Sequence, residues 1–107
     1  MIFKPMRVIS RRSLREFWEK HSTAKNSLLL WYDRITKSDL ENFAQLRQLF
    51  PSADLVGNFT VFNISGNNYR LITYIDYQAQ IIFIRDVLIH ADYDKENWKN
   101  DDWFNNP

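Results

Sequence analysis

The sequence predicts an α+β domain in which N-terminal helices pack on a small antiparallel sheet and a short C-terminal helix follows. Apolar residues recur with helical spacing through the first fifty positions, and three β-branched and aromatic runs follow between positions 59 and 88. Helices followed by consecutive hairpins are typical of this class. The 107 residues correspond to one domain, with an expected core over about 6–98 and a polar tail over 99–107.

The N-terminal segment predicts an edge strand followed by a helix. Met6–Ile9 is short and apolar, as expected for a strand at the side of a sheet. Ser10 or Ser13 is expected to cap the helix, and Ser13 is preferred because Ser13 and Glu16 have the spacing of a capping box. One face of that helix is apolar or aromatic, and its members are Leu14, Phe17, Trp18 and His21.

Two more helices are expected before the sheet. The first runs from about Ala24 to Ile35. The second opens at the capping box formed by Ser38 and Glu41, and Pro51 ends it.

The period then changes to that of strands. Phe59–Ile64, Tyr69–Asp76 and Ile81–Leu88 are predicted to form an antiparallel meander, because turn-forming residues separate them. A short helix is expected from Tyr93 to about Trp98.

The turn lengths predict which strand residues are neighbours. A turn over residues 65–68 pairs Asn63 with Arg70, and a second loop of two or four residues pairs Ile72 with Arg85. Arg70 and Arg85 would then be diagonal neighbours about 7–8 Å apart on one face. A loop of odd length would instead place Arg85 on the opposite face. With helices on one face only, the other face is expected to be free to present side chains.

Composition excludes several classes of chemistry. There is no cysteine, so disulfides, cysteine-ligated metals and thiol nucleophiles are excluded. The two glycines are too few for a phosphate-binding loop or a dinucleotide fingerprint. Neither a membrane-spanning run nor the apolar stretch of a secretory signal is present, so we expect a cytoplasmic protein with no membrane partner.

The net charge of +1 conceals an asymmetry along the chain. Residues 1–47 sum to +5 and residues 48–107 to −4. Five cations and no acid occupy the first fifteen positions, and we expect Arg11, Arg12 and Arg15 to bind RNA or an acidic partner. A solvated basic helix face explains the charge pattern equally well.

The polar residues expected near the sheet suit phosphodiester chemistry on RNA. They are Asn63, Arg70, Arg85, His90, Tyr93 and Lys95. RNA supplies its own nucleophile, the 2′-hydroxyl, so the reaction needs a base, an acid and cations rather than a metal ion or a cofactor. His90 is a candidate base or acid, Tyr93 or Lys95 the second proton-transfer group, and Arg70 and Arg85 the phosphate ligands.

Each of these residues also has a structural interpretation. Arg85 lies beside Asp86 and on the predicted face of Asp76, so an ion pair competes with a phosphate contact. His90 could bond a backbone carbonyl at the strand end, and Tyr93 could anchor a core.

The chain resembles the HigB family of bacterial type II toxins, within the RelE/ParE-like superfamily. The resemblance covers about residues 6–98, and its motifs are Arg7–Ser10, Leu14–His21, Phe50–Asp54, Val61–Ile64, Gly66–Leu71, Phe83–Arg85, His90–Lys95 and Trp98. It implies a RelE-like fold and an endoribonuclease that cuts messenger RNA, usually on translating ribosomes. It also implies a cognate HigA antitoxin with a helix-turn-helix domain, through which alone the toxin reaches operator DNA.

The resemblance also bears on individual residues. It points to Arg70, Arg85, His90, Tyr93 and Lys95 as the active-site set. Members of the family commonly carry Thr immediately before the histidine, where this chain has Ile89. That departure motivates an alternative, a catalytically weak or inactive RNA- or protein-binding module of the same fold. A third alternative is a toxin that acts on DNA gyrase, as ParE relatives do.

Overall fold

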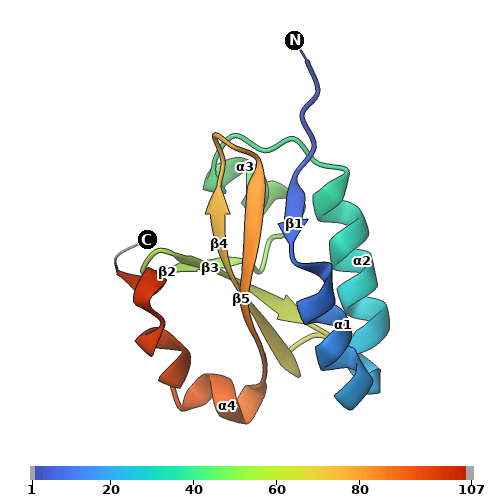
Figure 1. Ribbon diagram of the computed structural model, residues 1–107, viewed down its shortest axis with the longest axis vertical. Coiled ribbons are helices and arrows are strands. Elements are labelled where there is room, and N and C mark those ends of the chain that lie inside the picture. Colours follow the sequence, from blue (N-terminus) through green and yellow to red (C-terminus); the bar gives the residue numbers. More distant parts are fainter. Residues whose placement is uncertain (1, 106–107) are drawn as a thin grey trace.

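A five-stranded mixed sheet forms the centre of the protein, which we describe over residues 2–105 of a computed structural model (Figure 1). The strands lie in the order β1-β5-β4-β3-β2. Their bounds are β1 Arg7–Ile9, β2 Asp54–Val56, β3 Phe59–Ile64, β4 Tyr69–Asp76 and β5 Ile81–Ile89. The meander of β3, β4 and β5 confirms the predicted hairpins. The edge strand β1 runs parallel to β5, so the sheet is not wholly antiparallel.

The first helix begins earlier than its capping box predicted. α1 spans Arg11–Lys20, and Ser10 rather than Ser13 precedes it as the cap. Ser10 has an extended backbone because it leaves β1 directly, and its carbonyl accepts the N–H of Ser13 at 3.2 Å to close the first turn. α2 spans Lys25–Thr36, within one residue of the predicted helix.

The third helix also uses a different cap from the one predicted. α3 spans Phe43–Leu49. The Asn42 side chain accepts the N–H of Gln45 at 2.9 Å, and the Gln45 side chain accepts the N–H of Glu41 at 2.8 Å. Ser38 instead donates its hydroxyl to the Ile35 carbonyl at the end of α2, so the box at Ser38 and Glu41 does not form.

One face of the sheet is covered by helices, as the sequence predicted. α1 and α2 lie side by side against it (Figure 1). The side chains that fill this larger core include Leu14, Leu28, Trp31, Ile35, Leu46, Phe62, Leu71 and Ile82. No helix of the described chain is long and apolar enough to cross a membrane.

The second face, expected to be free, is covered by the C-terminal segment. The last predicted helix starts early, as α4 over His90–Asp94, and two 3₁₀ turns at Asn97–Asn100 and Asp102–Phe104 carry the chain back towards β2 (Figure 1). A second apolar cluster forms there from Phe59, Val61, Ile72 and Trp98, with Trp103 and Phe104 packed against it. Residues 99–104, expected to be a polar tail, therefore bury aromatic rings that would otherwise face water.

A bulge changes the register of β5. Asn63 pairs with Arg70, as predicted. Thr73 pairs with Ile84 but Ile72 pairs with Asp86, so Arg85 has no partner on β4. The predicted pairing of Ile72 with Arg85 is wrong because the strand accommodates one extra residue at this point.

Candidate active site

Arg70 is a buried cation near the start of β4. Its side chain is held by neutral acceptors: Nη1 donates to the carbonyls of Asn67 and Tyr69 at 3.0 and 3.1 Å, and Nη2 donates to the Asn67 side-chain oxygen at 2.6 Å. The residue is only 9% exposed. Within the described chain no carboxylate lies within 4.0 Å of its guanidinium. The Arg70 charge is therefore fixed in place without a counter-ion from the described residues.

The ring of Tyr93 lies beside the Arg70 guanidinium. The guanidinium carbon is 5.2 Å from the ring centroid, and Trp98 stacks on the same ring at 5.1 Å with an interplanar angle of 8°. Burial raises the pKa of the Tyr93 phenol, the Arg70 charge opposes that rise, and the Asp54 charge adds to it. The phenol is therefore protonated at neutral pH.

A cavity of about 270 Å³ opens in front of these two residues. Asn63 of β3, Arg70 and Tyr93 line it. Its other lining residues are Arg47, Pro51, Ser52, Ala53, Asp54 and Val61. Three of the predicted site residues thus share one polar hollow.

His90 begins α4 and is anchored to the turn that holds Arg70. Its backbone N–H donates to the Asn68 carbonyl at 3.1 Å, and its side-chain Nδ1 lies 3.1 Å from a carboxylate oxygen of Asp94. The side chain thus pairs with a carboxylate rather than with the backbone carbonyl that the structural interpretation expected. An Nδ1–H that donates to Asp94 leaves Nε2 with a free lone pair. His90 and Tyr93 are three residues apart on α4, so their Cβ atoms are about 5–6 Å apart.

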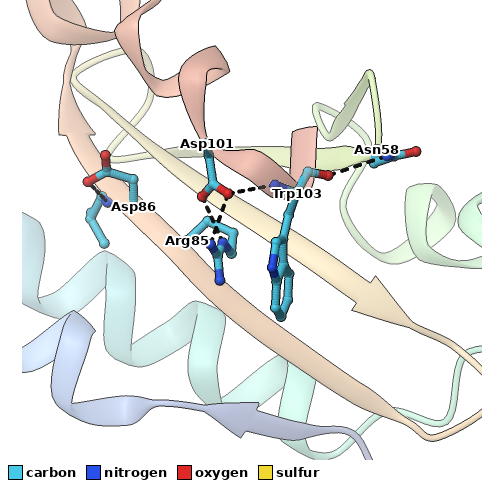
Figure 2. Close-up of polar contacts among 6 residues, drawn as sticks. Asn58, Arg85, Asp86, Asp101 and Trp103 are labelled. Carbon is cyan, nitrogen blue, oxygen red and sulfur yellow. Dashed lines mark hydrogen bonds and ion pairs between the residues drawn. The ribbon is translucent and has the colours of Figure 1, made fainter. Parts of the chain in front are cut away.

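Arg85 is engaged in a different way (Figure 2). Its Nε and Nη2 both donate to the Asp101 carboxylate at 2.8 Å, and its guanidinium carbon lies 4.0 Å from the Trp103 ring centroid. Asp101 also accepts the N–H of Trp103 at 2.9 Å, and Asn58 donates to the Trp103 carbonyl at 3.3 Å. The hydrogen bond from Arg85 lowers the pKa of the Asp101 carboxyl. Arg85 forms an ion pair, but with Asp101 rather than with Asp76 or Asp86.

The remaining predicted residues lie apart from the Arg70 cavity. Lys95 is exposed, and its ammonium is 3.6 Å from the Asp92 carboxylate. The three arginines proposed for RNA binding lie on α1, in the helical layer. Arg12 pairs with Glu16 at 2.7 Å, Arg15 lies 3.9 Å from Glu19, and Arg11 lies over the rings of Trp18 and Tyr32. The structure therefore gathers Asn63, Arg70 and Tyr93 around one cavity. His90 lies three residues before Tyr93 on α4 but does not line that cavity, and the others lie elsewhere.

Several site residues were missed from the sequence. Asp94 follows His90 by four positions, a helical spacing that predicts contact. Asn67 lies in a turn that was predicted, and its side-chain oxygen reaches a neighbouring arginine. Arg47 and Asp54 flank a loop, and no spacing signals that they approach Arg70. Within residues 2–105, His, Asp and Glu side chains form no group of three or more that could hold a metal ion.

Together, the fold and the site define a small α+β domain with a buried arginine, a protonated tyrosine and a carboxylate-paired histidine. The family model of HigB toxins, described as the RelE-like toxic component of a toxin-antitoxin system, matches residues 24–96. The chain belongs to this family.

Similar proteins carry names that specify a reaction. The mRNA interferase toxin HigB of Escherichia coli (strain K12) is 29% identical over 92 residues, which cover 83% of this chain and 88% of that protein. The mRNA interferase HigB of Shigella flexneri has the same identity and coverage. The mRNA interferase HigB of Escherichia coli O6:H1 is 29% identical over 93 residues, or 84% of this chain and 90% of that protein.

Proposed function

We propose that this toxin cleaves messenger RNA, with the scissile phosphate bound at Arg70. The observation that carries the proposal is the buried Arg70 guanidinium, which has donors fixed by Asn67 and no carboxylate within 4.0 Å in the described chain. A guanidinium fork matches phosphate oxygens, and burial strengthens the attraction. The names of the similar proteins support messenger RNA as the substrate.

His90 and Tyr93 divide the two proton transfers in this proposal. His90 Nε2 removes the proton of the 2′-hydroxyl, and the 2′-oxygen attacks phosphorus. The bond from phosphorus to the 5′-oxygen breaks, and the Tyr93 phenol donates its proton to that leaving oxygen. The products are a 2′,3′-cyclic phosphate and a free 5′-hydroxyl, while Arg70 stabilises the negative charge that accumulates on the phosphate.

The other predicted site residues take supporting roles. Arg85 holds residues 101–104 against the sheet, and Phe104 of that segment contacts Trp98, which stacks on Tyr93. We therefore treat Arg85 as a positioning residue. Lys95 is exposed and contacts the RNA backbone beyond the scissile bond.

The partners follow from the toxin role. We infer that a cognate HigA-type antitoxin with a helix-turn-helix domain neutralises the toxin and carries it to operator DNA. We infer also that cleavage takes place on ribosomes in the cytoplasm. The basic surface of α1, with Arg11, Arg12 and Arg15, binds ribosomal RNA or an acidic surface of the antitoxin.

The position of Ile89 favours an enzyme over an inactive binding module. Ile89 packs against the larger cluster, on the face of the sheet that the helices cover. Arg70 and Tyr93 lie on the other face, beside the second cluster. The side chain of Ile89, which stands where the family commonly has Thr, therefore points away from the proposed site.

Cleavage assays on purified protein test the proposal. We expect the wild type to cut a defined messenger RNA in a translation reaction, and His90→Gln to cut it about 10²–10⁴-fold more slowly because the base is lost. His21→Gln is the matched control, since His21 stacks on Phe17 of α1 in the helical layer. Intact messenger RNA with the wild type, both with and without ribosomes, would contradict the proposal. Broken DNA under the same conditions would favour action on gyrase.

A further inference from the structure

The lining of the Arg70 cavity includes two charged residues that no step of the mechanism uses. Arg47 lies in the last turn of α3, and Asp54 is the first residue of β2. Both line the same hollow of about 270 Å³ as Arg70 and Tyr93. Pro51 and the two residues after it, which connect them, also line the cavity.

These charges face one cavity without neutralising one another. In the part of the chain that the structure describes, no ion pair of 4.0 Å or less involves Arg47, Asp54 or Arg70. Within residues 2–105, the Arg47 side chain makes a single long hydrogen bond, 3.5 Å, from Nε to the Pro51 carbonyl. Burial is the main cause of the raised pKa of the Tyr93 phenol, and the negative charge of Asp54 adds to the rise. The space between these groups therefore suits a ligand that is anionic at one end and donates hydrogen bonds at the other.

A nucleotide has both of these properties. Its phosphate matches Arg70, and the edge of its base can reach a carboxylate. An ionised carboxylate only accepts hydrogen bonds, so it favours a base that presents an amino group. Adenine, cytosine and guanine present such a group, whereas uracil presents only one imino N–H, between two carbonyl oxygens that a carboxylate repels.

We propose that this cavity is a nucleotide subsite beside the scissile phosphate, in which Asp54 selects amino-bearing bases and Arg47 contacts the RNA backbone. The inference rests on the proposed RNA substrate and deepens it, because it assigns base selection to Asp54.

The sharpest test measures binding of probes that cannot be cleaved. Deoxyribose lacks the 2′-hydroxyl nucleophile, so pentamers of deoxyadenylate, deoxycytidylate and deoxyuridylate bind without reacting. We expect the wild type to bind the adenylate and cytidylate pentamers about 10-fold more tightly than the deoxyuridylate pentamer. In Asp54→Asn the three affinities should converge, since the amide both donates and accepts. Arg47→Ala should weaken all three equally.

A control and a second readout complete the experiment. Asp33→Asn removes an exposed carboxylate on α2 that pairs with Lys37, and it should keep the wild-type preference. Asp54→Ser provides a second variant, and circular dichroism verifies the fold of each. Equal affinity of the wild type for the three pentamers, or an unchanged preference in the folded Asp54 variants, would overturn the subsite. If the wild type did not cleave messenger RNA, that result would instead contradict the proposed function. The two failures can be told apart because the binding assay does not depend on cleavage.

Discussion

Two arginines on the same face of the sheet are held in opposite ways. Arg70 is fixed by carbonyl and amide oxygens, which carry no net charge. Arg85 is fixed by both oxygens of the Asp101 carboxylate. Each guanidinium also lies near one aromatic ring, Tyr93 for Arg70 and Trp103 for Arg85.

We infer that the difference separates a ligand-binding site at Arg70 from a contact at Arg85 that holds the fold together. A buried cation without a counter-ion is costly, so it is expected where an anionic ligand compensates it. A cation already paired with a carboxylate has little attraction left for a phosphate. Arg85 instead joins β5 to residues 101–104, and these residues cover the second apolar cluster.

The largest expected effect follows from replacing Arg70. Arg70→Ala removes the charge that stabilises the transition state, so cleavage should fall by about 10²–10³-fold. Single-turnover cleavage of a defined messenger RNA measures this fall. Arg34→Ala on α2 removes an arginine outside the cavity and should cut at the wild-type rate.

Arg70→Lys sharpens the same comparison. Lysine keeps the charge but cannot form the fork that Asn67 orients, so most of the loss should remain. Full activity of the lysine variant would contradict the role given to the fork.

Replacing Arg85 or its partner Asp101 should have a smaller effect, and that effect should appear in the free energy of unfolding. Asp101→Asn or Arg85→Ala breaks a charged double hydrogen bond, which should lower the free energy of unfolding by about 1–3 kcal/mol. Urea unfolding at neutral pH measures it. The double variant should lose less than the two single losses together, because both act on one contact. Additive losses would show that the pair is not coupled.

The sequence predicted contacts between residues that are close along the chain better than contacts between residues that are far apart. The pairing of Asn63 with Arg70 was predictable, because a four-residue turn sets the register between β3 and β4. The bulge at Arg85 was not, since the alternation of β5 gives no sign of an unpaired residue.

Residues 99–104, the segment that covers the second face of the sheet, show the same limit of sequence-based prediction. Asp101 is sixteen residues from Arg85, and no periodicity links the two. The contacts of Trp103 and Phe104 depend on how the chain turns after α4. Packing across the sheet decided this part of the structure, and the sequence pattern did not.

Substitutions at the two glycines test the packing of residues 99–104 against the sheet without removing a charge. Gly57 and Gly66 both have positive φ angles, 58° and 65°, so alanine strains both to a similar degree. A Cβ atom at Gly57 would lie 2.7 Å from the Phe104 ring, whereas the same atom at Gly66 meets open space. Gly57→Ala should therefore cost about 1 kcal/mol more than Gly66→Ala in thermal unfolding. Equal losses would show that the Phe104 ring moves aside freely.

The smallest expected effect is the pH dependence of the Arg85–Asp101 pair. Because the pKa of Asp101 is lowered in the folded state, the unfolded chain takes up its proton first as the pH falls. The stability from this carboxylate is therefore present above its usual pKa near 3.8 and is lost as the pH falls through the lowered value. The difference in stability between the wild type and Asp101→Asn should accordingly shrink below about pH 4. Asp86 must be controlled, because burial raises its pKa and the Asp101 charge contributes to that rise. Repeating the titration in an Asp86→Asn background isolates the pair, and a difference that stays constant to low pH would assign the Asp101 contribution to packing rather than charge.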